Sequence, residues 1–126
     1  MLVSEEASPT IRGNLFVNNR ANWGGALHVG AFTLTTDREL PTPTIEGNIF
    51  LSNVASLGGG AVNIVVSHTS VRGNTFQGNE TESGDGGGIK IRLARGSASV
   101  VDNRFIDNLT MLLRIKGVDL TRTQAY

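Results

Sequence analysis

Apolar and polar residues alternate in three short stretches of the chain, and each stretch follows a run of glycines. A period of two residues places successive side chains on opposite faces of a β-strand. The expected inward positions are Leu27, Val29 and Ala31, then Val62, Ile64 and Val66, then Ile89, Ile91 and Leu93. The intervening outward positions begin with His28, Asn63 and Lys90. No window combines sustained helical periodicity with caps, so the pattern predicts an all-β protein.

A second pattern, Phe-x-x-Asn, recurs four times, and a further Asn stands two residues before each Phe. Glycine precedes that further Asn in three copies, and Asp102 replaces it in the fourth. The copies contain Phe16, Phe50, Phe76 and Phe105, preceded by Asn14, Asn48, Asn74 and Asn103. Registered repeats of this kind are the sequence signature of a solenoid.

One repeat unit of 26 to 34 residues is too small to bury its own apolar face, so its copies are expected to stack. Equivalent residues would then lie about 4.8 Å apart in vertical ladders. We expect a Phe stack inside, and an Asn ladder at a corner where Asn tolerates the left-handed conformation. Arg12, Glu46 and Arg72 share one outward repeat position and are expected to form a charge ladder.

The sequence predicts a lead-in or cap over residues 1–8, about four coils over 9–108, and a cap or frayed tail over 109–126. The last segment begins as a final strand or a short helical cap. Polar insertions at 35–43 and 78–86 are expected to form surface loops. Open strand edges invite pairing, so we expect a fragment or short module that associates end to end or continues into further coils.

Composition narrows the function classes. Eleven basic and eleven acidic residues give zero formal net charge, which argues against a nucleic-acid-binding field. The chain has no Cys, so it contains neither disulfides nor thiolate metal sites. No apolar run is long enough to insert in a membrane. The N-terminal residues lack the basic and apolar regions of a secretory signal, so we expect no signal peptide in this chain.

The Phe-x-x-Asn copies (Phe16/Asn19, Phe50/Asn53, Phe76/Asn79 and Phe105/Asn108), followed by Gly-Gly-Ala or Gly-Gly-Gly-Ile, resemble right-handed parallel β-helix proteins of the pectin-lyase-like class. The same two motifs are similar to those of chlamydial polymorphic outer membrane proteins and related bacterial surface proteins. The resemblance covers about residues 9–108. It implies a right-handed parallel β-helix, an extracellular or cell-surface location and contact with polysaccharide. A shared fold does not by itself assign an activity.

The outward face of the glycine-led strands is the candidate ligand-binding surface. It carries His28, Asn63 and Lys90, with Arg92 two residues beyond Lys90. In the resembled lyases the substrate lies along such a face, and basic side chains neutralise uronate carboxylates. Trp23 either stacks on a sugar or packs over the open edge of the first coil. His28 and His68 fall on different parts of the repeat, so the sequence predicts no metal site.

Two functions stay open. The leading hypothesis is a non-enzymatic structural or adhesion-type module of a bacterial surface or secreted protein that contacts glycans. The alternative is a polysaccharide lyase or glycoside hydrolase, or a truncated relative of one. Its candidate catalytic residues are Asp85, Lys90 and Arg92. Under the lyase alternative alone, Ca²⁺ would be a cofactor; otherwise we expect none.

Overall fold

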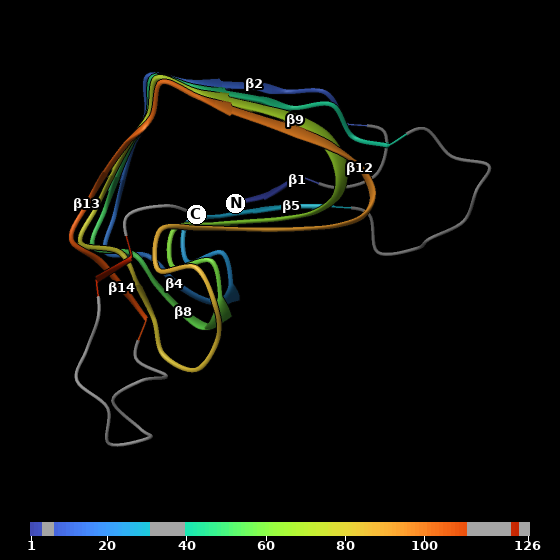
Figure 1. Ribbon diagram of the computed structural model, residues 1–126. Coiled ribbons are helices and arrows are strands. Elements are labelled where there is room, and N and C mark those ends of the chain that lie inside the picture. The colour runs from blue at the N-terminus through green and yellow to red at the C-terminus, as the bar shows by residue number, and fades with distance from the viewer. Residues whose placement is uncertain (4–6, 31–39, 111–121, 124–126) are drawn as a thin grey trace.

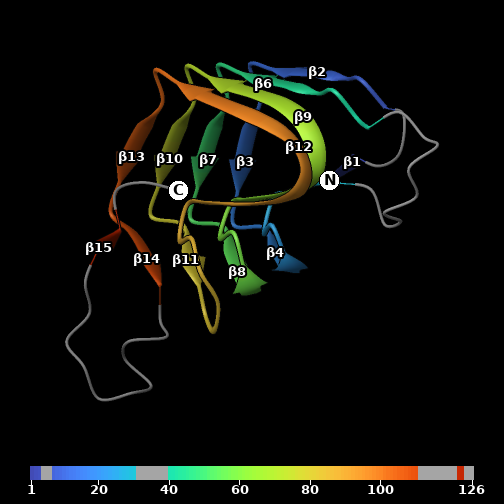
Figure 2. The same cartoon turned by 45° about the vertical axis from the view of Figure 1, so that its right-hand side comes forward.

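The computed structural model describes residues 1–3, 7–30, 40–110 and 122–123, and these residues form strands and turns without helix. The protein is therefore all-β. The predictions made for Ala31, for most of the 35–43 insertion and for most of segment 109–126 concern residues outside these ranges. Figures 1 and 2 show the chain turning repeatedly around one interior, with successive turns stacked along a common axis.

Three sheets surround that interior, and the chain visits them in turn. The first sheet contains β1 (Leu2–Val3), β5 (Leu27–Val29), β9 (Val62–Arg72), β6 (Thr44–Glu46), β2 (Thr10–Arg12) and β12 (Ile89–Val101). The second contains β3 (Leu15–Val17), β7 (Ile49–Leu51), β10 (Thr75–Gln77) and β13 (Arg104–Ile106). The third contains β4 (Arg20–Trp23), β8 (Val54–Gly58), β11 (Glu80–Thr81), β14 (Asn108–Thr110) and β15 (Arg122–Thr123).

Neighbouring strands come from successive copies of the repeat. In the second sheet the four repeat phenylalanines are register partners, and the strands that carry them are parallel. Among the described strand pairs, only β14 and β15 are antiparallel. Stacked, parallel and in-register copies are consistent with a β-helix or solenoid-like fold.

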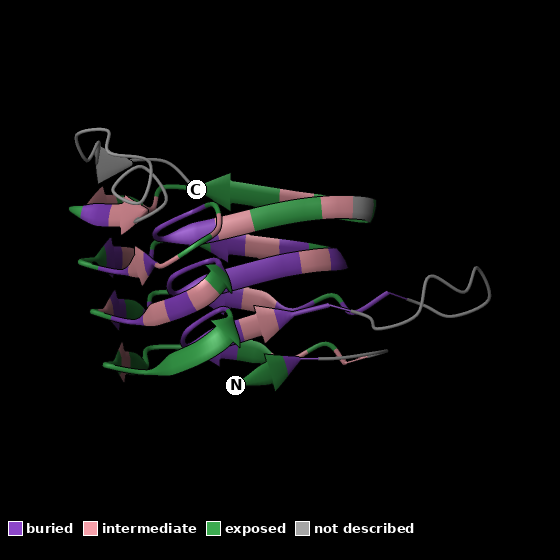
Figure 3. Ribbon diagram, turned by 90° about the horizontal axis from the view of Figure 1, so that it is seen from below, coloured by how far each residue is buried: buried purple, intermediate pink, exposed green. Residues whose placement is uncertain are grey.

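A stack of phenylalanine rings fills the interior beside the second sheet, as the repeat predicts. The ring centroids of Phe16 and Phe50 are 5.0 Å apart, those of Phe50 and Phe76 are 4.8 Å apart, and those of Phe76 and Phe105 are 4.9 Å apart. Adjacent rings lie within 6° of parallel. The two middle rings are fully buried, and Figure 3 shows buried residues concentrated in the middle turns of the chain.

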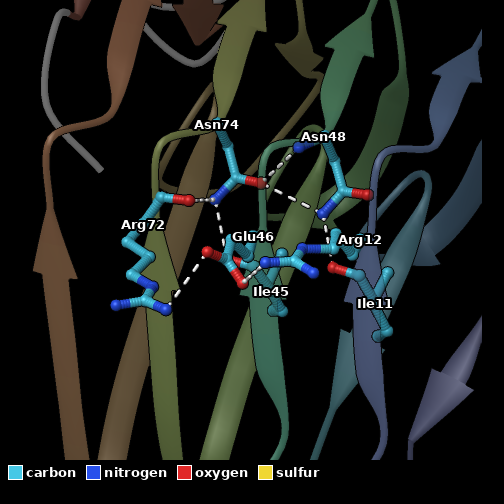
Figure 4. A network of polar contacts seen from close by, with 7 residues as sticks. All are labelled: Ile11, Arg12, Ile45, Glu46, Asn48, Arg72 and Asn74. Atoms are coloured by element: carbon cyan, nitrogen blue, oxygen red, sulfur yellow. Dashed lines mark hydrogen bonds and ion pairs between the residues drawn. The ribbon is translucent and has the colours of Figure 1, made fainter.

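The predicted asparagine ladder is also present, and Figure 4 shows its central part. The Nδ2 atom of Asn48 donates to Asn74 Oδ1 at 3.1 Å and to the Ile11 carbonyl at 2.8 Å. The backbone N–H of Asn48 also donates to Asn74 Oδ1, at 2.9 Å. Each inner amide thus bonds both neighbouring turns, which satisfies polar groups that would be costly to bury alone.

A second asparagine ladder forms at the next corner, between the second and third sheets. The Nδ2 atom of Asn53 donates to Asn79 Oδ1 at 3.0 Å, and that of Asn79 donates to Asn108 Oδ1 at 2.9 Å. These three side chains are buried. Both asparagines of the repeat unit are therefore structural.

The backbone at the first corner corrects one expectation. The left-handed conformation belongs to the residue before each ladder asparagine, not to the asparagine itself. The φ angles are +64° at Gly13, +61° at Gly47, +63° at Gly73 and +55° at Asp102. A residue without a Cβ adopts this conformation at no steric cost, which explains why three of the four copies use glycine.

The predicted charge ladder lies beside the first corner (Figure 4). Glu46 Oε2 lies 3.4 Å from Arg12 Nη2, and Glu46 Oε1 lies 3.1 Å from Arg72 Nη2. Both arginine side chains are more than half exposed, so water weakens each pair. The ladder therefore contributes little to stability.

The burial of two segments that were expected on the surface, and of one position that was expected in the core, differs from what the sequence predicts. The 78–86 segment includes strand β11, whose Thr81 is buried and donates to the Gly86 carbonyl at 2.9 Å. Within the 35–43 segment, Leu40 is also buried. Ile91 is 37% exposed because β12 is the outermost described strand on its side of the sheet.

Candidate functional site

The predicted row of outward-facing residues is present on the first sheet. His28 on β5, Asn63 on β9 and Lys90 on β12 are successive register partners. Parallel pairing of in-register strands places their side chains in one row on the same face. These three residues therefore come together from segments that are far apart in the sequence.

His28 and Asn63 are directly hydrogen-bonded, with Asn63 Nδ2 lying 3.0 Å from His28 Nδ1. Burial lowers the pKa of His28 from its ordinary value of 6.5, and the positive N-terminal amine lowers it further. Because the amide nitrogen of Asn63 faces Nδ1, this contact corresponds to the neutral tautomer that accepts at Nδ1 and carries its proton on Nε2. The structure thus places the amide nitrogen of Asn63, and not its oxygen, toward His28.

Asn63 points outward from its strand but is only 1% exposed. Its Oδ1 atom is the one buried side-chain polar atom in the described part of the chain that has no hydrogen-bond partner. A buried acceptor without a donor is destabilising, and such exceptions are rare in folded proteins.

Trp23 ends strand β4 and is 42% exposed. Lys90 Nζ lies 5.2 Å from the centre of the indole ring, within the range of a cation–π contact. Gly58, the register partner of Trp23, leaves room for this contact. A Cβ atom at Gly58 would lie 2.7 Å from Lys90 Cδ and 3.2 Å from Trp23 Cζ3.

Asp85 joins this cluster from the turn before β12. It forms an isolated parallel bridge with Gly58, and its Oδ2 lies 3.7 Å from Lys90 Nζ. The Asp85 side chain is 81% exposed, whereas that of Lys90 is 18% exposed. The ammonium therefore sits between an aromatic face and a solvated carboxylate.

Two adjoining cavities surround Lys90, and together they are termed the Lys90 groove. The smaller, of about 280 Å³, is lined by Trp23, His28, Asn63, Val65, Lys90 and Arg92. The larger, of about 560 Å³, is lined by Asp85, Gly86, Ile89, Lys90, Ile91, Arg92 and Thr110. All six candidate residues from the sequence thus lie around one groove.

No protein-family model, curated protein or solved structure matches this chain. The chemistry of the groove itself is therefore the basis for assigning a function.

The groove combines an aromatic surface with charged and neutral polar groups. Lys90 and Arg92 supply two cations against the single carboxylate of Asp85 among the lining residues. Sugar rings pair apolar C–H faces with hydroxyl groups, and a site that presents Trp beside hydrogen-bonding groups suits both. The described residues contain no group of three or more His, Asp or Glu that could hold a metal ion.

The two histidines lie apart, as predicted. His28 is on β5, whereas His68 is on the far half of β9 and its Nδ1 lies 2.9 Å from Ser97 Oγ. No helix among the described residues is long and apolar enough to cross a membrane.

Sequence reasoning missed two residues that shape the groove. Val65 shares a repeat position with Gly30 and Arg92, and it lines the smaller cavity. Gly58 is the first of three glycines that precede Ala61, whereas only two glycines precede Ala26 in the first copy. This extra glycine was a usable signal, because a position without a side chain often marks close approach of neighbouring groups.

Proposed function

We propose that this chain is a non-enzymatic structural or adhesion-type module of a bacterial surface or secreted protein, and that it contacts glycans through the Lys90 groove. In this proposal the stacked turns are about four coils of a right-handed parallel β-helix. The asparagine and phenylalanine ladders support it, because they use the repeated residues for architecture and leave only the outward positions for recognition.

The observation that carries the proposal is the exposed Trp23 ring beside Lys90, Arg92, His28 and Asn63. These side chains project from paired strands, so the groove is held before any ligand arrives. Pre-organised sites lose less conformational entropy on binding than mobile loops do. A rigid aromatic surface with adjacent donors and acceptors matches the needs of a carbohydrate ligand.

The non-enzymatic assignment is supported by the acidic side chains. Glycoside hydrolysis ordinarily uses two carboxyl groups that flank the scissile bond. Asp85 is the only carboxylate among the residues that line the groove. The nearby Glu82 is paired with Arg20 instead.

A second candidate function is favoured by one observation. Asp85, Lys90 and Arg92 line the same cavity, and the first two form an ion pair. In a polysaccharide lyase or hydrolase, Asp85 would act as a base or acid, while the cations would neutralise substrate carboxylates. Calcium would be needed only if elimination occurs, with Asp85 supplying one oxygen ligand.

A paired binding and turnover experiment separates the two functions. The purified chain would be screened on a glycan array and then incubated with pectate, alginate and neutral polysaccharides, with and without Ca²⁺. We expect array binding without formation of unsaturated products or new reducing ends. Product formation that disappears in Asp85→Asn would establish the enzyme instead. If the chain showed no binding and no turnover, both assignments would be overturned.

A further inference from the structure

We propose that the Lys90 groove selects N-acetylated amino sugars and takes their acetamido group at Asn63. This inference rests on the proposed glycan contact and narrows its ligand to one chemical class.

The unpartnered Oδ1 atom of Asn63 sets the first requirement on the ligand. Asn63 Nδ2 is already used by His28 Nδ1 at 3.0 Å, so the side chain is held with its oxygen free to accept. Burial lowers the pKa of His28 and so favours the neutral imidazole, whose Nε2–H tautomer accepts this hydrogen bond at Nδ1. The matching ligand group is therefore an N–H or O–H donor.

The apolar lining of the smaller cavity sets the second requirement. Trp23 is 42% exposed and lies with Val65 around the same cavity as Asn63. Val65 Cγ2 occupies the space beside Gly30, where a Cβ atom on that glycine would clash with it. A small apolar group beside the ligand's donor would be removed from water when it packs against these two side chains.

The third requirement comes from Lys90, the register partner of Asn63. Its ammonium has three donor hydrogens, and its contacts are the Trp23 ring at 5.2 Å and Asp85 at 3.7 Å. A ligand carbonyl could accept from it. The long, unbranched side chain of Lys90 can shift to admit a ligand, because neither contact is a close hydrogen bond.

An acetamido group meets the three requirements with adjacent atoms: its N–H donates to Asn63 Oδ1, its carbonyl accepts from Lys90 Nζ, and its methyl packs on Trp23 and Val65. A uronate carboxylate would satisfy Lys90 and Arg92, but it has no hydrogen for Asn63 Oδ1. A deacetylated amino sugar would donate to Asn63, but its ammonium would be repelled by Lys90 and Arg92.

Isothermal titration with two matched ligands tests the proposal. Chitohexaose and cellohexaose have the same backbone and linkage and differ in having an acetamido group or a hydroxyl at each ring. We expect chitohexaose to bind the chain about ten-fold more tightly, the effect of one additional well-placed hydrogen bond and a buried methyl. Equal affinities, or a preference for cellohexaose, would overturn the inference.

The Asn63→Leu variant, which is close to isosteric but cannot accept, should lose this preference. Thr10→Val, a polar-to-apolar change at an exposed position of β2, should retain it. Thermal unfolding followed by circular dichroism checks that both variants fold. If Asn63→Leu does not fold, saturation-transfer NMR on the wild-type chain decides, with the strongest transfer expected at the acetyl methyl protons and transfer confined to ring protons contradicting the inference.

The outcomes also distinguish this inference from the proposed function. Array binding of other glycans without preference for chitohexaose would remove the acetamido selectivity alone. Absence of binding to every glycan would remove both.

Discussion

Lys90 Nζ lies 5.2 Å above the indole ring of Trp23, although the two residues belong to different sheets. A Cβ atom at Gly58 would lie close to both side chains, so the absence of one leaves room for their contact. A tryptophan at the end of one strand and a lysine at the start of another thereby form one wall of the groove. The contact depends on the stacking of successive turns, which connects the fold directly to the site.

Replacing Gly58 with Ala should separate these two side chains at little cost to stability. The new Cβ would meet the flexible Lys90 chain, so the free energy of unfolding should change by less than about 1 kcal/mol. The fluorescence of Trp23, the only tryptophan, should shift, and Lys90→Ala should cause a similar shift. Gly60→Ala is the contrasting variant, because its Cβ would strike the Gly87 carbonyl and the backbone of Glu80. An equal loss of stability in both glycine variants would show that the Gly58 site is not open.

Asn74→Leu should be strongly destabilising. Asn74 donates to the Ile45 carbonyl and to Asn103 Oδ1, and accepts from Asn48, so leucine would leave several buried groups unpaired. We expect a loss of about 3 kcal/mol in urea unfolding. Asn14→Leu, at the exposed end of the same ladder, should cost about 1 kcal/mol or less. Similar losses at both positions would contradict a role for ladder bonding in stability.

The residue with positive φ before each ladder asparagine yields a pair of opposite predictions. Asp102→Gly should raise the free energy of unfolding by up to about 1 kcal/mol, since it relieves a Cβ clash at φ +55°. Gly47→Ala should lower it by about 1–2 kcal/mol, although a Cβ there meets no neighbour within 4 Å. Thermal unfolding of both variants measures the effect. If Gly47→Ala left the free energy of unfolding unchanged, the left-handed backbone conformation would not explain why glycine stands at this position.

Stability should decrease in mildly acidic solution because of His28. Burial, followed by the N-terminal amine, lowers its pKa in the folded protein, so the unfolded chain takes up the proton first. The contribution of His28 to the free energy of unfolding should be largest above pH 6.5. It should decrease as the pH drops below 6.5 and level off once the pH is below the pKa of His28 in the folded protein. Urea unfolding across this range should show a weaker pH dependence in His28→Gln. An unchanged dependence would exclude His28 as the source.

The sequence predicted the ladders well because their residues repeat in register. Phe50 and Phe76, like Asn48 and Asn74, occupy identical positions in each copy, and stacking then follows from the need to bury one face. The left-handed position was assigned to the asparagine because Asn tolerates that conformation. Glycine tolerates it better, and Gly47 and its equivalents take it instead.

The groove was predictable only in part. The alternation placed His28, Asn63 and Lys90 in one outward row, and the structure confirms that row. Their period could not reveal that Asn63 is buried, because alternation assigns a side chain to one face of a strand and does not say what packs against that face. Trp23 had two interpretations from its neighbours in sequence, and its contact with Lys90 depends on side-chain packing between different turns.

Retention on immobilised glycans, measured for the wild-type chain, Trp23→Ala and Leu15→Ala, tests most directly whether the Lys90 groove is a glycan-binding surface. Leu15 is the matched control, since it is 61% exposed and apolar but lies on β3 of a different sheet. We expect the wild-type and Leu15→Ala proteins to bind alike, and Trp23→Ala to bind about ten-fold more weakly. Undiminished retention of Trp23→Ala, or no retention of any of the three proteins, would contradict it.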